Sequence, residues 1–285
     1  MNPFVLSFAD GTTFFVGLGL VLVAQVLVFR FRNRVARKVF TVATIVGVIV
    51  VIISATPLPT WAYAIWAIPA ISGLVLLNQA RPARKLSLVT GCATLVSTVG
   101  LCLAETPYHR SPTVQIPKGT IVYVIGDSIS AGMGTREHCW PAVLEEMTSF
   151  SVVNLAQQGA KVGSAIVQAE GVSKPASMVI IEIGGNDLLG GTDAATFHAS
   201  LETLVSSLRP EQHAVMLVEL PLLPFQNAYG RAQRAVVRKH GLAMLPKRFF
   251  AGVLGTKDGT LDGLHLSQAG HNAMAQAIAR VLKEE

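Results

Sequence analysis

Four apolar stretches without a charged residue dominate the N-terminal part of the chain. They run over residues 13–29, 39–55, 61–77 and 86–104. A helix needs about 20 apolar residues to cross the hydrocarbon core of a bilayer, with a range of roughly 17–25. A buried helix of a soluble protein rarely stays free of charge over such a length. The sequence therefore predicts an N-terminal all-α transmembrane bundle of four helices within residues 1–104.

The loops between these stretches predict the orientation of the bundle. Residues 30–38 hold five Lys and Arg residues, and the segment around Arg81, Arg84 and Lys85 is also basic. Residues 56–60 carry no charge. Basic loops stay on the cytoplasmic side, so the N-terminus and everything after residue 104 should lie on the extracytoplasmic side of a bacterial inner membrane. Residues 1–11 lack Lys and Arg, which favours a retained first helix over a cleaved signal peptide.

The charge of the chain is unevenly distributed. Residues 1–110 carry nine basic and two acidic residues, a net charge of +7, whereas residues 111–285 have a net charge of −1. The near-neutral C-terminal part argues against nucleic acid as a partner. Residues 105–119 contain three prolines and read as a linker. Three cysteines, Cys92, Cys102 and Cys139, are too few and too scattered for a disulfide framework.

From residue 120 onward, short apolar runs alternate with stretches typical of helices. The expected strands are residues 120–125, 151–155, 178–183 and 214–218. The expected helices are residues 140–147, 163–170, 195–208, 228–240 and 268–282, the last with Ser267 as N-cap. This alternation predicts an α/β domain over residues 120–285, with a parallel sheet covered on both faces.

Polar or glycine-rich turns follow three of the expected strands. Ser128 follows the first strand, Gly159 the second, and Gly184–Asn186 the third. Binding sites in such sheets form at the carboxyl ends of the strands, so these turns should meet at one edge. Each turn taken alone is also compatible with an ordinary loop, since Gly, Asn and Asp favour turns.

A serine nucleophile requires further parts elsewhere in the chain. A serine needs an imidazole to accept its proton and a carboxylate to orient that imidazole. His265 and Asp262, three positions apart, offer both, although in isolation they also fit a solvated loop. The backbone N–H groups of Ser128 and Gly159 and the side-chain amide of Asn186 could stabilise an oxyanion.

The blocks taken together resemble the SGNH (GDSL) hydrolase family. They are Gly-Asp-Ser at 126–128, Gly159, Gly-Gly-Asn-Asp at 184–187 and Asp-x-x-His at 262–265, in family order over residues 121–282. Trp-Pro-Ala at 140–142 and residues 182–187 and 227–231 look closest to the bacterial thioesterase I/lysophospholipase-like branch. The resemblance implies a three-layer, flavodoxin-like fold.

The resemblance also implies roles for individual residues. Ser128 would be the nucleophile, His265 the base and Asp262 its orienter. Ser128, Gly159 and Asn186 would form the oxyanion hole, and Asp127 would be structural. A membrane bundle departs from the soluble relatives.

The sequence therefore predicts a membrane-anchored extracytoplasmic serine esterase. Its substrate is expected to be an acyl ester, with lysophospholipid-like molecules favoured by the lipid bilayer. No cofactor and no metal is expected, because no histidine or cysteine has metal-ligand spacing. Two alternatives stay open. One is an O-deacetylase or acyltransferase for envelope glycans, and the other is an inactive SGNH module that serves as a binding or scaffold part.

Overall fold

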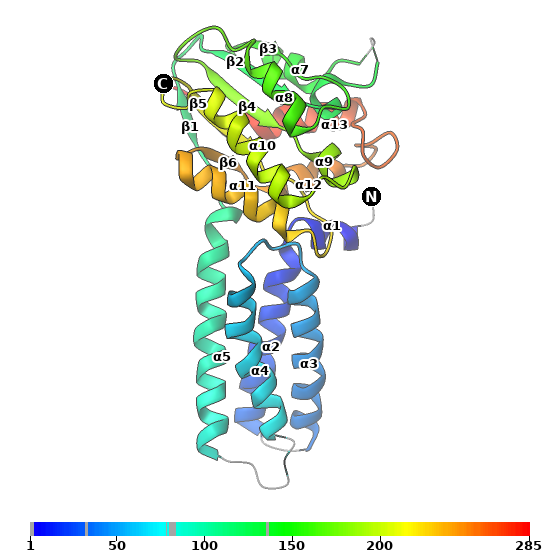
Figure 1. Cartoon of the computed structure of the whole chain (residues 1–285). Helices are drawn as coiled ribbons and strands as arrows, with labels where there is room; N and C mark the ends of the chain where they lie inside the picture. Colours follow the sequence, from blue (N-terminus) through cyan, green and yellow to red (C-terminus); the bar gives the residue numbers. More distant parts are fainter. Residues whose placement is uncertain (1–2, 32–33, 78, 80–83, 135–136) are drawn as a thin grey trace. The chain divides into compact units, whose positions relative to one another are not determined.

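The chain forms two compact units, shown in a computed structural model (Figure 1) that describes all residues except 1–2, 32–33, 78, 80–83 and 135–136. One unit is helical and comprises residues 7–109 and 223–227. The other contains residues 3–6, 110–222 and 228–285, and it holds both sheets.

Long helices make up the first unit. They are α2 (Thr12–Phe31), α3 (Arg34–Ile53), α4 (Thr60–Leu77) and α5 (Arg84–Glu105), with the short helix α1 (Pro3–Ala9) before them and the 3₁₀ turn η1 (Thr106–His109) after them. Helices α2 and α3 approach closely at Gly17 and Gly47, where a Cβ on either glycine would lie 2.8 Å from the carbonyl oxygen of the other. Helices α4 and α5 are joined by a hydrogen bond of 2.8 Å from Trp66 Nε1 to Thr98 Oγ1.

The apolar helices agree in part with the four expected spans. Among the described residues, three helices are long and apolar enough to cross a membrane: Arg34–Ile53, Thr60–Leu77 and Lys85–His109. Thr12–Val28 is a shorter apolar helix. The basic segment 30–38 was expected to be a loop, but Arg34, Arg37 and Lys38 lie inside α3. Arg and Lys are good helix formers, so their charge did not mark a break. Arg32 and Arg81 lie outside the described residues.

The second unit is built on a parallel sheet of five strands. Its strands are β2 (Ile121–Gly126), β3 (Ser151–Asn154), β4 (Met178–Glu182), β5 (Ala214–Val218) and β6 (Ala243–Leu245), in the spatial order β3-β2-β4-β5-β6. Every neighbouring pair is parallel. This is the doubly wound order 2-1-3-4-5, whose ligand crevice lies where the strand order reverses, between the first and third strands. Those strands are β2 and β4 here.

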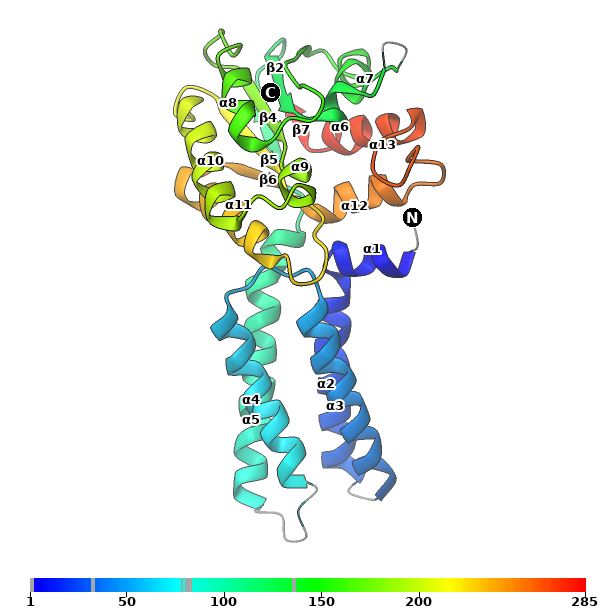
Figure 2. The ribbon, with the colours of Figure 1, turned by 45° about the vertical axis from the view of Figure 1, so that its right-hand side comes forward.

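Helices cover both faces of this sheet. They are α6 (Ser128–Ala131), α7 (Trp140–Met147), α8 (Val162–Ala169), α9 (Gly185–Leu189), α10 (Ala194–Ser207), α11 (Asn227–His240), α12 (Lys247–Gly255) and α13 (Gln268–Ala279). Figures 1 and 2 show α8, α10 and α11 on one face, and α7, α12 and α13 on the other. Residues of β2 and β4 are almost all buried, since central parallel strands are covered twice. The expected parallel α/β fold is confirmed.

Some short elements differ from the sequence-based expectation. The strand β6 and the helix α12 were not predicted. Residues 105–119, expected as a linker, hold η1 and the strand β1 (Val114–Ile116), which pairs in parallel with β7 (Leu282–Glu284). A three-residue strand is too short to show apolar alternation in the sequence. Its place in a sheet depends on a pairing partner far away along the chain, which no local pattern reveals.

Candidate active site

Ser128 is the first residue of α6, directly after the turn that ends β2. Asp127 caps this helix, because its Oδ1 accepts the backbone N–H of Ile129 at 3.0 Å. Residue 126 must be glycine, since a Cβ there would lie 2.8 Å from the carbonyl oxygen of Glu182. The turn therefore places Ser128, half-buried, at the carboxyl end of β2.

Asp262 and His265 form a pair in the loop between α12 and α13. His265 Nδ1 lies 2.6 Å from Asp262 Oδ2, and Asp262 Oδ1 accepts the backbone N–H groups of Leu264 and His265 at 2.9 and 2.8 Å. These hydrogen bonds, chiefly that of the His265 ring, hold the pKa of Asp262 well below its usual range. A carboxylate only accepts, so Nδ1 carries the proton of a neutral His265 and Nε2 is free to act as a base.

The His265 loop lies within electrostatic reach of the Ser128 turn. Burial raises the pKa of Asp127 to about 6, whereas the backbone N–H of Ile129 and, whenever it is protonated, the His265 ring act to lower it. Asp127 immediately precedes Ser128. His265 therefore acts on the residue that precedes Ser128, although the two segments are far apart in the sequence.

Asn186 and Gly159 occupy the turns after the neighbouring strands. Asn186 is the second residue of α9, and its Nδ2 donates to the carbonyl oxygen of Ala160 at 3.0 Å and to Asp127 Oδ2 at 3.3 Å. Gly184, the N-cap of α9, has φ +118°, a conformation that favours glycine. Gly159 has φ +71°, and no described atom lies within 4 Å of the position that a Cβ would take. Its backbone is therefore open on that side.

Side-chain hydrogen bonds join the loop after β3 to the Ser128 turn. Asn154 Nδ2 donates to the carbonyl oxygen of Ser130 at 2.8 Å, and Gln158 Nε2 donates to that of Gly132 at 2.7 Å. The contacts of Asn186 with Ala160 and Asp127 add the turn after β4 to the same set. The turns that carry Ser128, Gly159 and Asn186 are thus connected at the carboxyl edge of β3, β2 and β4.

A sequence profile matches this part of the chain. It describes the GDSL-like Lipase/Acylhydrolase family and matches residues 124–273, just over half of the chain. The chain belongs to this family. All five candidate site residues of this GDSL hydrolase lie inside the matched range.

Named relatives agree with the family match. Esterase TesA of Pseudomonas aeruginosa is 27% identical over 212 residues, which cover 69% of this chain and 96% of TesA. A crystal structure of TesA is 28% identical with a TM-score of 0.51, and the alignment covers 57% of this chain and 97% of TesA. The esterase EstA from Pseudoalteromonas sp. is 18% identical to this chain, with a TM-score of 0.50. The alignment covers 57% of this chain and 96% of EstA, and at this identity it supports only a shared fold. This GDSL hydrolase is thus an ester hydrolase, and an acyl ester is its substrate.

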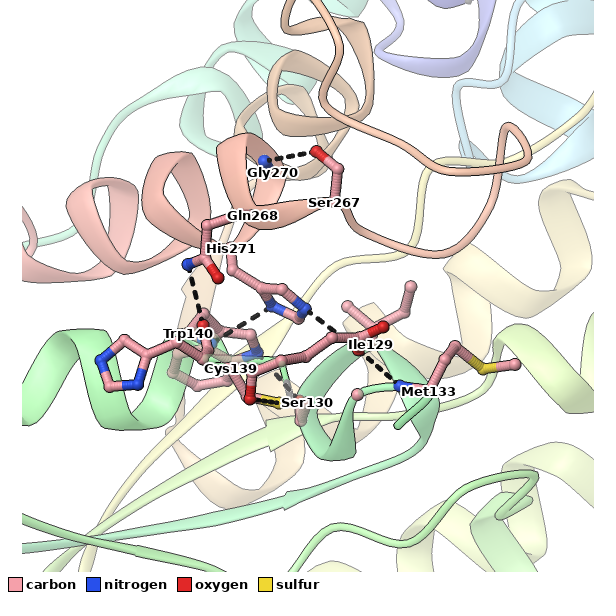
Figure 3. Close-up of polar contacts among 12 residues, drawn as sticks. Ile129, Ser130, Met133, Cys139, Trp140, Ser267, Gln268, Gly270 and His271 are labelled. Atoms are coloured by element: carbon pink, nitrogen blue, oxygen red, sulfur yellow. Dashed lines mark hydrogen bonds and ion pairs between the residues drawn. The ribbon is translucent and has the colours of Figure 1, made fainter. Parts of the chain in front are cut away.

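A buried polar chain supports the Ser128 turn of the hydrolase. Ser130 Oγ donates to Glu182 Oε2 at 2.7 Å. The same oxygen accepts from Trp140 Nε1 at 3.1 Å (Figure 3). Burial, and then the charge of Asp127, raises the pKa of Glu182 well above its usual range. The hydrogen bonds that join Glu182, Ser130 and Trp140 were not predicted from the sequence. The signal that could have found it is an acid at the end of the apolar strand β4, because a buried carboxyl needs a partner.

A second polar cluster brings together three side chains with metal-ligating atoms. Glu137, Cys139 and His271 each offer one ligand atom, and these atoms lie within 4.8 Å of one another. Figure 3 labels Cys139 and His271. His271 Nδ1 accepts the backbone N–H of Trp140 at 3.2 Å, so Nε2 carries the proton of the neutral ring. A metal ligand must offer a lone pair, and histidine ligands usually donate through their other nitrogen. The hydrogen bonding of His271 therefore does not suit a metal site.

A separate cavity lies away from the candidate site. It has a volume of about 410 Å³ and lies before the amino ends of β4 and β5, where Ser173, Arg209 and His213 are among its lining residues. None of the candidate site residues lines it. Burial lowers the pKa of His213, whose Nδ1 lies 2.8 Å from Ser177 Oγ. This cavity therefore lies at the amino ends of the strands, apart from the candidate site at their carboxyl ends.

Proposed function

We propose that the chain is a membrane-anchored serine esterase that works through an acyl-enzyme on Ser128. The observation that carries the proposal is the 2.6 Å contact between His265 Nδ1 and Asp262 Oδ2, in a loop whose imidazole acts electrostatically on Asp127, the residue before Ser128. This contact fixes the ring so that its unprotonated Nε2 is available as a base. Acyl transfer by a serine requires this arrangement.

The reaction has two steps. Ser128 Oγ attacks the carbonyl carbon of the ester while His265 Nε2 accepts the hydroxyl proton. The tetrahedral intermediate collapses, the bond to the leaving oxygen breaks, and His265 returns its proton to that oxygen. Water then attacks the acyl-enzyme with His265 again as base, which releases the acid and restores Ser128.

The developing oxyanion needs hydrogen-bond donors that are already in place. The backbone N–H groups of Ser128 and Gly159 and the Nδ2 of Asn186 are the proposed donors. The hydrogen bonds between the three turns support this assignment, since they hold the turns together. Asn186 Nδ2 has two hydrogens, which it donates to Ala160 and Asp127, so the longer bond, 3.3 Å to Asp127 Oδ2, must give way when the oxyanion forms. Removal of one such donor typically costs about 10²–10³ in kcat.

The N-terminal unit is proposed to be a four-span membrane anchor. Residues 1–104 would be the anchor, 105–119 the lead-in, and 120–285 the hydrolase domain. Three apolar helices of sufficient length and a shorter fourth support this division. Many side chains exposed on the helices are aliphatic, such as Val26, Ile65 and Val96, and a lipid environment would cover them. The basic residues of segment 30–38 and those around Arg84 and Lys85 support a topology with the N-terminus and the hydrolase domain on the extracytoplasmic side of a bacterial inner membrane.

Long acyl esters such as lysophospholipids are the proposed substrates. A membrane anchor keeps the hydrolase domain beside lipids, which raises their local concentration at the site. Exposed apolar side chains next to the site residues also support this choice, since Leu264 adjoins His265, Leu261 adjoins Asp262, and Leu189 lies in the same short helix as Asn186.

Ester hydrolysis by detergent-purified protein tests the proposal. We expect p-nitrophenyl esters of long chain to be cleaved faster than the acetate ester, with Ser128→Ala inactive. Equal rates for the wild type and Ser128→Ala would contradict a serine esterase and favour an inactive binding module. A strong preference for acetate would favour deacetylation of glycans over lipid hydrolysis.

Cysteine labelling in intact cells tests the orientation. In a variant with Cys92, Cys102 and Cys139 replaced by serine, Lys174→Cys reports on the hydrolase domain and Arg34→Cys on the first basic segment. We expect a membrane-impermeant maleimide to label Lys174→Cys in intact cells and Arg34→Cys only after permeabilisation. The reverse pattern would overturn the proposed topology.

A further inference from the structure

The segment between β5 and α11 contains a tight turn and no charged residue. Residues 220–227 read Leu-Pro-Leu-Leu-Pro-Phe-Gln-Asn. The backbone N–H of Gln226 donates to the carbonyl oxygen of Leu223 at 3.2 Å, and the N–H of Leu223 donates to Gln226 Oε1 at 3.4 Å. Residues 223–226 therefore form a closed β-turn, with Pro224 and Phe225 at its two central positions.

Phe225 occupies a position of this turn that favours glycine. Its φ is +69°, and it follows a proline, as the glycine of a type II turn often does. A bulky residue with a positive φ is an outlier, and such residues gather at functional sites. Phe225 is also 78% exposed, and Leu223 is 50% exposed. The turn therefore holds a large apolar ring away from the protein, in a backbone conformation that costs free energy.

The turn lies at the end of α3 that is far from its basic residues. Residues 223–227 belong to the helical unit, and Asn227 Nδ2 donates to the carbonyl oxygen of Ser54 at 3.5 Å. Ser54 directly follows α3, whose other end carries Arg34 and Arg37. The 20 residues of this helix span about 30 Å, the thickness of the hydrocarbon core of a bilayer. If the basic end is cytoplasmic, the turn lies at the outer surface of the membrane.

Trp61 marks the same end of the helical unit. It lies in the first turn of α4, which residues 54–59 connect to α3, and it is 65% exposed. Tryptophan is enriched where a membrane meets water, because its ring is apolar while its N–H group is polar. A turn without charge fits this place as well, since no charged side chain has to leave water when it enters the leaflet.

We propose that Phe225 and Leu223 insert into the outer leaflet of the membrane that surrounds the helices. The inference rests on the proposed membrane anchor, and it adds a lipid contact made by the segment that follows β5. Lipid would cover the two apolar side chains that the protein leaves exposed, and their burial would offset the cost of the positive φ at Phe225.

The same segment begins at the edge of the sheet that carries the candidate site. It follows the carboxyl end of β5, and β5 pairs with β4, whose turn carries Asn186. Leu220 and Leu222 at its start are buried, and the N–H of Leu220 donates to Gln233 Oε1 at 3.1 Å. A fixed start on the hydrolase domain and a tip in lipid should favour substrates that arrive from the bilayer over substrates dissolved in water.

Hydrolysis in proteoliposomes tests this consequence. Phe225→Ser should lower kcat/KM for p-nitrophenyl palmitate held in phosphatidylcholine liposomes by about tenfold, since burial of a large apolar side chain changes an equilibrium by about this factor or more. For water-soluble p-nitrophenyl butyrate, the same proteoliposomes should stay within about twofold of the wild type. Val167→Ser is the matched control, because it removes a similarly exposed side chain from α8. An equal loss on both esters, or no loss on either, would contradict a role in access from the bilayer.

Spin labelling of the full-length protein in the same liposomes tests the insertion without an activity measurement. With the three native cysteines replaced by serine, a nitroxide on Phe225→Cys should collide more often with oxygen, which concentrates in the bilayer, than with a water-soluble nickel chelate. Labels on Val96→Cys, an exposed position of the apolar helix α5, and on Lys174→Cys of the hydrolase domain provide the lipid and water references. Leu223→Cys repeats the measurement if Phe225→Cys does not fold.

The three labels separate the possible failures. A label at position 225 that meets the nickel chelate as readily as Lys174→Cys does would overturn the inference. So would a label that neither reagent reaches, because protein, such as a second copy of the chain, would then cover the turn. Oxygen access at Val96→Cys would leave the proposed anchor intact in both cases, whereas nickel access there would contradict the anchor itself. A wild type that hydrolyses no ester would overturn the proposed activity but not a lipid signal at position 225.

Discussion

The two sides of the candidate site hold their carboxylates in opposite ways. Asp262 lies in an exposed loop, and its pKa is lowered by the His265 ring and two backbone N–H groups. Asp127 lies in the floor of the site, and burial raises its pKa to about 6. The comparison teaches that local hydrogen bonds build the proposed Asp262–His265 pair, whereas packing builds the turns that carry Ser128 and Asn186.

The largest effect is expected from the exposed side. His265→Ala should lower kcat/KM for p-nitrophenyl esters by about 10⁴-fold, because Ser128 then lacks a base. His198→Ala is a matched control, since His198 lies on α10 and outside the site. A loss of less than tenfold in His265→Ala would show that another group accepts the serine proton.

A smaller effect is expected from the partner of this histidine. Asp262→Asn should lower kcat by about 10- to 10³-fold, less than the roughly 10⁴-fold known for a buried triad aspartate, because water can replace part of its contact at an exposed site. The side chain of Asp262 is 53% exposed, which makes such replacement feasible. Steady-state kinetics at pH 8 measures the loss. A drop as large as that of His265→Ala would show that water does not replace the contact of Asp262 with His265, despite the exposure of Asp262.

The buried side should show itself in the pH dependence of stability. The pKa of Asp127 is raised from its ordinary value of 3.8 to about 6, so the folded state holds a proton between about pH 4 and pH 6 that the unfolded state has lost. The contribution of Asp127 to stability should therefore fall as pH rises through that window, by about 3 kcal/mol, and stay constant above it.

Thermal melting of the detergent-purified protein measures this dependence. Asp127→Asn, which stays neutral, should gain stability relative to the wild type as the pH rises from 4 to 7. A difference between the two proteins that does not change with pH would contradict the raised pKa.

The smallest effects are expected at Glu182. Glu182→Gln should retain activity within a few fold, because burial favours the neutral carboxyl by raising its pKa and an amide oxygen can still accept from Ser130. Glu182→Ala leaves the Ser130 hydroxyl without this acceptor and should lower the free energy of unfolding by about 1–3 kcal/mol. Chemical denaturation compares the two variants. An equal loss of stability in both would show that Glu182 is ionised in the folded protein.

The sequence predicted the parts of this molecule that depend on local patterns. The strands β2, β4 and β5 are continuous apolar runs, and the Asp262–His265 pair needs only a spacing of three residues. The contact of Asp127 with Asn186 and the Glu182–Ser130–Trp140 chain join residues far apart in the sequence, so only the packed fold reveals them. The strands β1, β6 and β7 were missed because each has three residues and is defined by its partner.

Covalent labelling of the active serine tests the central claim most directly. A fluorophosphonate probe reacts with a serine only where a base and an oxyanion hole activate it. After reaction with the full-length protein in detergent, peptide mass spectrometry should find the phosphonyl group on Ser128 of the wild type, and labelling should be lost in His265→Ala. Labelling of a different residue, or equal labelling of Ser128 in both proteins, would contradict the account.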